Sequence, residues 1–311
     1  MSAVSSPRGA SPIRELSLGV LDVGAFPFSV ALAPGVEALG YQRFWLAEHH
    51  GERATTNPTL AVPLIAGLTR SMRVGTAGVL LRFQSALSVA ESHRMLQHVF
   101  AGRIDLGLAR GQPPHATLVT RLLDGRPDAY SAADHAAKVA DVQALLCGRP
   151  PLSPFVPDAL VEPPLTDAGP PQMWVLSTSP SGAELAAKLG SHYSFHDHYN
   201  PRQGPDAVKQ YVAEFRPSPE VAEPSWNVCI AGYCAESAEE VKRIERSWFA
   251  TSDAGRRQFV GTRDEWRLWL REIAESYGTP EVIVQTLFGV YDAEQQLASF
   301  ARIAEVARTL A

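Results

Sequence analysis

The sequence contains little cysteine and no long uncharged apolar segment. Its 311 residues include three cysteines, Cys147, Cys229 and Cys234, whose spacing fits neither a disulfide framework nor a metal motif. An odd and small number of cysteines favours a reducing compartment, so we expect a cytoplasmic protein. No uncharged apolar run reaches the roughly 18 residues of a membrane span, and residues 1–15 lack the apolar stretch of a signal peptide.

The chain also lacks an excess of positive charge. Its formal net charge is −5, with 20% charged and 45% hydrophobic residues. A nucleic-acid-binding domain normally presents a basic face, so nucleic acid is not the expected partner. No G-x-G-x-x-G follows the first strand-like segment, and no G-x-x-x-x-G-K-[ST] occurs anywhere, so Rossmann-type and P-loop nucleotide binding are unsupported.

Short apolar segments alternate with helical patterns along most of the chain. Segments with strand character are 16–21, 43–47, 72–79, 104–109, 173–177, 192–195, 226–231 and 282–286. Several are almost continuously apolar, which is typical of parallel strands buried on both faces. Helical patterns include 88–100, 181–189 and the segment after Thr262, which has capping-box spacing with Glu265. We therefore predict a (β/α)8 TIM barrel, with a doubly wound open sheet as the alternative.

Two segments fall outside this alternation. Residues 1–15 are expected to form a flexible N-terminal tail. Residues 149–171 are crowded with proline, which excludes a helix, and are interpreted as an insertion before the fifth strand. The alternation resumes afterwards, so residues 16–311 are expected to form one domain.

Polar or small residues follow five consecutive strands of this predicted barrel. They are Glu48-His49-His50, Thr76-Ala77-Gly78, Ala109-Arg110-Gly111, Ser177 to Gly182, and His196-Asp197-His198. In such barrels the carboxyl ends of the strands meet at one face, where function gathers. Adjacent strand residues point to opposite sides, so at most one of His49 and His50 is expected to face the barrel mouth. One of the two could be a proton shuttle, both could be metal ligands, or either could be a hydrogen-bonded structural histidine.

A hydroxyl-rich turn leads directly into the predicted helix at 181–189. Its polar or flexible residues are Thr178, Ser179, Ser181 and Gly182. A helix N-terminus offers unpaired N–H groups to a phosphate, and Arg110 could add a guanidinium. Ordinary N-capping by a hydroxyl, with Arg110 in a salt bridge at the rim, is the alternative.

Two further patterns each allow a ligand or a structural explanation. Ala77 and Gly78 are small enough for a flat ring to approach the backbone, or they mark a strand bend. His196 and His198 have the spacing of two metal ligands, with His49 as a possible third. Metal ranks second, because metal-dependent barrel hydrolases usually carry H-x-H at the first strand, where this chain has Leu21-Asp22-Val23.

The run from Phe44 to Gly111 resembles the flavin-dependent luciferase-like monooxygenases, the family of the bacterial luciferase alpha subunit. The shared motifs stand in the family's order: W-L-A-E-H-H at 45–50, N-P at 57–58, R-V-G-T-A-G-V-L-L at 73–81, A-E at 90–91 and G-R-I-D-L-G-L-A-R-G at 102–111. E-L-A-A-K-L-G at 184–190 and V-G-T at 260–262 extend the resemblance to about residues 16 to 290. Ala109 stands where luciferase has a reactive cysteine, and the pattern is more similar to relatives from natural-product pathways than to light emitters.

The resemblance implies a (β/α)8 barrel that holds reduced FMN as a co-substrate at its carboxyl-terminal face. It also implies a two-component monooxygenase that uses O2 to oxygenate a small organic, secondary-metabolite substrate through a C4a-peroxyflavin. His49 corresponds to the catalytic histidine. Ala77 and Gly78 correspond to a segment beside the isoalloxazine, often with a non-proline cis peptide. Arg110, Ser179, Ser181 and Gly182 correspond to the residues that anchor the cofactor's phosphate, and Thr178 is expected to be a further cofactor-binding residue.

The same resemblance implies partners and leaves rivals open. A separate NAD(P)H:flavin reductase would supply reduced flavin, and the family commonly forms homodimers through its early helices. Some members use the deazaflavin F420 for hydride transfer without oxygen. A metal-dependent barrel hydrolase is a second rival, and a non-catalytic flavin-binding protein is a third. The oxygen chemistry calls for an enclosed apolar site, and we expect four aromatic residues to help line it: Phe26, Phe28, Phe83 and Phe195.

Overall fold

The computed structural model describes residues 16–24, 26–50, 55–111, 130–151, 168–249, 257–287 and 292–310. The predicted tail at 1–15 and residues 152–167 of the proline-rich insertion lie outside these ranges. The single-domain boundary at residue 16 therefore stays a prediction. Within the described part of the chain, a search for helices with the length and apolar character needed to span a bilayer finds none.

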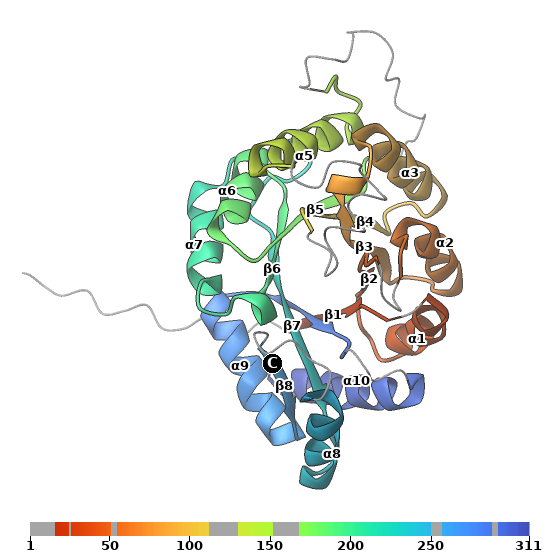
Figure 1. Ribbon diagram of the computed structural model, residues 1–311, viewed down its shortest axis with the longest axis vertical. Helices are drawn as coiled ribbons and strands as arrows, with labels where there is room; N and C mark the ends of the chain where they lie inside the picture. Colours follow the sequence, from red (N-terminus) through yellow and green to blue (C-terminus); the bar gives the residue numbers. More distant parts are fainter. Residues whose placement is uncertain are drawn as a thin grey trace, which may run out of the picture.

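Eight parallel strands close into a barrel surrounded by helices (Figure 1). They are β1 (Ser17–Asp22), β2 (Arg43–Leu46), β3 (Arg73–Leu80), β4 (Ile104–Ala109), β5 (Gln172–Ser177), β6 (His192–His196), β7 (Trp226–Cys234) and β9 (Glu281–Gln285). Each of β1 to β7 pairs with its successor, and β9 joins β7 to β1. The predicted (β/α)8 barrel is confirmed, and the doubly wound alternative is excluded by this closure.

One strand was missed by the sequence patterns. β7 runs three residues beyond the predicted 226–231, and its end, from Ala231 to Cys234, pairs with β8 (Gln258–Gly261). β8 has four residues and is mostly half-buried, so it lacks the apolar run that marked the other strands. In Figure 1, β7 extends out of the ring toward α8, with β8 beside it.

Helices follow the strands around the outside of the barrel (Figure 1). They are α1 (Phe26–Ala38), α2 (Pro58–Leu68), α3 (Ala86–Val99), α5 (Ala132–Leu146), α6 (Pro180–Leu189), α7 (Gly204–Glu214), α8 (Ala238–Phe249), α9 (Arg263–Tyr277) and α10 (Ala293–Arg308). Short 3₁₀ turns lie at Leu81–Phe83 and Asp197–Tyr199. The predicted capping box of Thr262 and Glu265 begins α9, and Gly278 ends it.

The two-residue period of the strands sorts side chains between the barrel interior and the helices. Leu21, Trp45 and Trp174 belong to an inner cluster, whereas Val20 and Phe44 join the main core with the helices. The same period turns Phe195 outward, where it packs against Tyr277 with ring centroids 6.0 Å apart. The prediction that Phe195 lines the site is therefore wrong, because its neighbour His196 takes the inward position.

A buried ionic cluster fills the amino-terminal end of the barrel. Asp105 is fully buried and accepts hydrogen bonds from Trp45 Nε1 at 2.9 Å and from Arg73 Nε at 2.8 Å. Arg43 pairs with Asp105 and also donates from Nε to Glu281 Oε1 at 2.9 Å. These side chains come from β2, β3, β4 and β9, so the cluster ties a large part of the ring together at this end.

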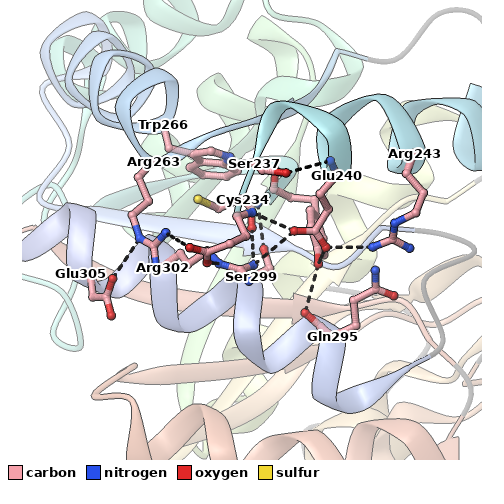
Figure 2. Close-up of polar contacts among 12 residues, drawn as sticks. Cys234, Ser237, Glu240, Arg243, Arg263, Trp266, Gln295, Ser299, Arg302 and Glu305 are labelled. Carbon is pink, nitrogen blue, oxygen red and sulfur yellow. Dashed lines mark hydrogen bonds and ion pairs between the residues drawn. The ribbon is translucent and has the colours of Figure 1, made fainter.

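Polar contacts also lock the extension of β7 to the helices beside it (Figure 2). Arg302 of α10 and Arg263 of α9 both donate to Glu236, from Arg302 Nε at 2.6 Å and from Arg263 Nη1 at 3.1 Å. The Cys234 amide donates to Ser299 Oγ at 2.8 Å (Figure 2). None of these residues lines the cavity described below.

Candidate functional site

A cavity of about 660 Å³ opens at the carboxyl ends of the strands. This volume lies in the usual range for small-molecule sites. All of the sequence-predicted site residues contribute to its lining: His49, Ala77, Gly78, Arg110, Thr178, Ser179, Ser181 and Gly182. The fold thus brings together side chains from four separate strand ends, as the meeting of parallel strands at one face requires.

Both His49 and His50 line this cavity. The expectation that at most one of them would face the mouth is wrong, because the strand pairing of β2 ends at Leu46. Beyond that residue the backbone no longer follows the strand alternation. The His49 amide donates to the Thr55 carbonyl oxygen at 3.0 Å, which sets the path of this loop.

The Glu48 carboxylate contacts the His50 ring. The buried carboxylate lies 2.7 Å from His50 Nε2 and accepts from the Leu80 amide at 3.0 Å. The His50 ring also packs edge-on against Phe83, with centroids 5.7 Å apart. Phe83 therefore supports a lining residue without lining the cavity itself. Phe28 packs against the main core instead, and the Phe26 side chain lies outside the described structure.

Ala77 and Gly78 are joined by a cis peptide bond, as the resemblance implied. The register between β3 and β4 also shifts between Thr76 and Val79, so the strand is irregular here. A Cβ on Gly78 would lie 2.6 Å from Leu176 Cδ1 and 2.9 Å from the Gly107 carbonyl oxygen. Glycine is required at this position by the close packing of β3 against its neighbours.

The turn before α6 gathers hydroxyl groups that do not cap the helix. Ser179 is the N-cap residue, yet its side chain makes no capping hydrogen bond. Its hydroxyl instead lies 3.0 Å from Ser181 Oγ and 3.3 Å from Ser177 Oγ. A Cβ on Gly182 would lie 2.0 Å from Ser177 Oγ, so glycine leaves room for that hydroxyl. The expected alternative of ordinary capping by Ser179 is therefore wrong.

Arg110 makes the rim beside this turn positive. It is exposed, donates to the Tyr130 carbonyl oxygen at 3.5 Å, and forms no ion pair with any residue that the structure describes. The predicted alternative of a rim salt bridge is thus not found there. Burial, and then the charges of Arg110 and Lys138, lower the pKa of His135 to about 4. Two cations that act on one histidine create a potential that suits an anion.

His135 and its helix were not identified as part of the site from the sequence. His135 lies on α5 and lines the cavity, and its Nδ1 is 3.1 Å from the Tyr130 hydroxyl. Ser131 and Asp134 form a capping box at the start of α5. Their three-residue spacing was the sequence signal that could have located this helix.

Two polar side chains reach the cavity from the barrel interior. His196 ends β6 and Gln285 ends β9. Within the described residues, His196 Nε2 and Gln285 Nε2 are buried without a hydrogen-bond partner. Burial lowers the pKa of His196 to about 4, so its ring is neutral at pH 7. Because both residues line the cavity, a molecule bound there could supply the missing hydrogen bonds.

The predicted trio of His49, His196 and His198 does not assemble. The third group that lies within reach of His196 and His198 is Cys229, not His49. β6 and β7 pair with His196 opposite Cys229, a neighbourhood that spacing along the chain cannot reveal.

Comparison with known families identifies the chain. The family model for luciferase-like monooxygenases matches residues 14–281. The chain belongs to the luciferase-like monooxygenase family. This luciferase-like monooxygenase is accordingly an oxidoreductase, as the sequence resemblance predicted.

Several known proteins are similar over most of the chain. YceB of Bacillus subtilis (strain 168), which is uncharacterized, is 30% identical over 325 residues, covering 94% of this chain and 96% of that protein. The N-acetyl-S-alkylcysteine monooxygenase of the same organism is 29% identical, covering 83% of this chain and 76% of that protein. The solved structure of apo-MsnO8 is 27% identical with a TM-score of 0.81, covering 94% and 98% of the two chains.

Two more distant structures share the fold alone and differ in cofactor. The oxygenating constituent of 3,6-diketocamphane monooxygenase from Pseudomonas putida, in complex with FMN, is 16% identical with a TM-score of 0.69 and covers 94% of this chain and 98% of its own. An F420-dependent secondary alcohol dehydrogenase is 11% identical with a TM-score of 0.69 and covers 94% of this chain and 99% of its own. Flavin and deazaflavin cofactors therefore both occur on this fold.

Proposed function

We propose that this luciferase-like monooxygenase uses reduced FMN and O2 to oxygenate a small organic substrate. A separate NAD(P)H:flavin reductase supplies the reduced flavin, since the chain has no dinucleotide fingerprint of its own. The proposal depends on one observation. A single cavity of about 660 Å³ joins the cationic rim at Arg110 to the Ala77–Gly78 segment and His49.

The rim fits the phosphate end of FMN. Ser179 and Ser181 present hydroxyls that do not cap α6, and the helix N-terminus adds its N–H groups and partial positive charge. Arg110 supplies a guanidinium that no described acidic residue neutralises. Charged hydrogen bonds from such donors anchor phosphates strongly. Thr178 lines the same end, with its carbonyl held by Asn200 Nδ2 at 3.0 Å.

The inner part of the cavity fits a flat, largely apolar ring. Leu21, Val23, Ala77 and Leu176 belong to the buried inner cluster and line the cavity. Gln285 carries an amide that can both donate to and accept from the polar edge of the ring. Apolar walls exclude water from the reacting atoms, which prevents wasteful release of peroxide.

His49 is the proposed catalytic residue at this end. When bound, reduced FMN supplies the electrons that split O2, one oxygen atom entering the substrate and the other leaving as water. The His49 imidazole can hold or deliver a proton, as general acid–base catalysis requires. The neighbouring His50 lies 2.7 Å from the Glu48 carboxylate through its Nε2, so we assign the proton-transfer role to His49.

The phosphate anchor is tested by comparing FMN with riboflavin. Arg110→Ala should weaken FMN binding by about 10- to 100-fold, the value of a charged hydrogen bond, and leave riboflavin binding unchanged. Flavin fluorescence quenching measures both affinities. Arg70→Ala, an exposed arginine outside the cavity, is the control and should bind FMN as the parent does. Equal affinity of the parent for FMN and riboflavin would contradict the anchor.

The role of His49 is tested by mixing the reduced-FMN complex with O2. His49→Ala should bind FMN within about twofold of the parent but change the rate of flavin reoxidation at least tenfold and abolish oxygenated product. Stopped-flow absorbance follows the flavin.

Reduced F420 is the rival co-substrate. Anaerobic turnover with reduced F420, together with none from reduced FMN and O2, would replace the monooxygenase by a hydride-transfer enzyme.

An apolar face on α2 and α3 supports the proposed homodimer. Leu60, Leu64 and Leu68 of α2 are 71%, 50% and 54% exposed, and Met95 and Val99 of α3 are 64% and 68% exposed. Exposed apolar residues that gather on one side of a protein are typical of an interface, and a second copy of the chain is the proposed occupant. Leu64→Glu should give a monomer in sedimentation experiments, whereas Leu268→Glu, on the 67% exposed Leu268 of α9, should not. The cytoplasmic location stays a prediction.

A further inference from the structure

Three metal-binding side chains meet inside the barrel, beside the proposed flavin site. They are His196 at the end of β6, His198 in the following 3₁₀ turn and Cys229 of β7. Their potential ligand atoms all lie within 4.8 Å of one another. His196 is 8% exposed, and His198 and Cys229 are fully buried. The parallel register sets His196 directly opposite Cys229, so strand pairing itself holds these two side chains together.

One atom of this group lacks a satisfying interaction. His196 Nε2 is buried and has no hydrogen-bond partner among the described residues. A buried polar atom without a partner costs free energy, and a bound cation would remove that cost. Among the residues that the structure describes, the Cys229 sulfur donates to the Ile230 carbonyl oxygen at 4.0 Å, which is a long and weak contact.

The donor atoms match zinc. Two imidazoles and a thiolate are typical Zn²⁺ ligands, with bonds of about 2.0–2.1 Å to nitrogen and about 2.3 Å to sulfur. Ligand atoms in such a tetrahedral site are roughly 3.3–3.6 Å apart, and those of the trio lie within 4.8 Å of one another. We propose that His196, His198 and Cys229 bind one Zn²⁺ ion.

The surroundings support a cation at this position. His198 Nδ1 lies 3.4 Å from the Cys229 carbonyl oxygen, the type of contact that orients a histidine with its other nitrogen toward a metal. The Asp197 carboxylate is buried nearby and accepts from the Tyr277 hydroxyl at 2.6 Å.

The site also has a place for a fourth ligand. Zinc with three protein ligands keeps one position for water or an oxygen atom of a small molecule. His196 is the member of the trio that lines the cavity, so a molecule in the cavity can approach the ion from that side. The inference goes beyond the proposed function, because zinc binding needs neither flavin nor O2.

The experiment is metal loading of the flavin-free protein after treatment with a chelator. Elemental analysis should find one zinc per chain, and Co²⁺ as a substitute should show a thiolate charge-transfer band together with tetrahedral d–d bands. Cys229→Ser should abolish the charge-transfer band. His196→Ala should weaken zinc binding by about 100-fold or more. Cys147→Ser and His98→Ala, outside the trio, are the matched controls and should bind zinc as the parent does.

Zinc content and zinc affinity decide whether the trio is a metal site. No zinc retained by the parent, or equal zinc affinity in the parent and His196→Ala, would overturn the proposal. Circular dichroism checks that each variant is folded. If Cys229→Ser does not fold, the Co²⁺ spectrum of the parent still decides, because the absence of a thiolate band would exclude Cys229 as a ligand. The FMN titrations of Arg110→Ala give an independent answer, so failure of one proposal does not imply failure of the other.

Discussion

Several histidines of this protein are buried where a charge cannot be solvated. His93 on α3 is fully buried, and its Nδ1 lies 2.9 Å from the Val89 carbonyl oxygen. Burial lowers the pKa of His93 to about 4, although the Val89 carbonyl opposes that shift. Burial also lowers the pKa of His192 to about 4, with Asp105 acting in the opposite direction. Both rings are therefore neutral in the folded protein at pH 7.

These buried rings make the fold sensitive to mild acid. An unfolded histidine binds a proton below about pH 6.5, whereas folded His93 stays neutral down to about pH 4. The unfolded state therefore binds more protons in this window, and the free energy of unfolding falls as the pH falls. His93→Leu should remove up to about 2 kcal/mol of the stability loss between pH 7 and pH 5. Urea unfolding at both pH values measures it.

The exposed His98 lies on the same helix and provides the control. His98→Leu should leave the stability loss between pH 7 and pH 5 as it is in the parent. An identical loss in His93→Leu and the parent would show that His93 does not contribute to acid sensitivity.

At the scale of elements, two helices end on glycines in the same left-handed conformation. Gly190 ends α6 with φ +58°, and Gly278 ends α9 with φ +55°. Their surroundings differ. A Cβ on Gly190 would lie 2.3 Å from the Arg216 carbonyl oxygen, whereas a Cβ on Gly278 would meet nothing within 4 Å. The end of α6 is packed against the segment after α7, while the end of α9 is open.

The two alanine variants should separate the cost of a left-handed backbone conformation from the cost of a steric clash of the added methyl group. Gly278→Ala should destabilise the protein by about 1 to 2 kcal/mol, the cost of a left-handed alanine. Gly190→Ala should cost at least about 2 kcal/mol more, because backbone must move to accept the methyl group. Chemical denaturation gives both values. Equal losses of stability in the two variants would mean that the segment after α7 can move to accept the methyl group at no cost in free energy.

At the scale of the whole molecule, both ends of the barrel carry polar residues, but one end is filled and the other is open. The amino-terminal end is filled by paired charges around Asp105, whereas the carboxyl-terminal end is hollow. Burial lowers the pKa of Arg43, but the Asp105 and Glu281 carboxylates raise it by more, so Arg43 remains charged. One end therefore holds strands together, and the other is available for chemistry.

Asp105→Asn tests this division. The substitution leaves Arg43 and Arg73 without their carboxylate, so it should cost about 3 to 5 kcal/mol of stability. FMN affinity should stay within about twofold of the parent at a temperature where the variant is folded, since the cavity lies at the other end. Glu184→Gln, which breaks the exposed pair with Lys188, is the control and should cost less than about 1 kcal/mol. A large loss of FMN affinity in Asp105→Asn would show that the two ends are coupled.

Local patterns in the sequence were sufficient to predict the barrel and several of the residues that line its cavity. Apolar strand segments, helix caps and glycine stops depend on neighbouring residues, so they can be read along the chain. Once a parallel barrel is expected, the residues after its strands must meet at one face, which is why Arg110 and the Ser179 turn were placed beside His49. Their roles in binding and catalysis stay proposals.

Only the tertiary structure decided which distant side chains touch. Strand register decides that Phe195 points away from the cavity and that His196 meets Cys229. Register and helix packing together place His135 and Gln285 in the cavity wall. The short strand β8 is recognisable only through its pairing with β7. A shift of one residue in register would reverse every inward and outward position of a strand, and no local pattern in this chain specifies register between segments far apart in sequence.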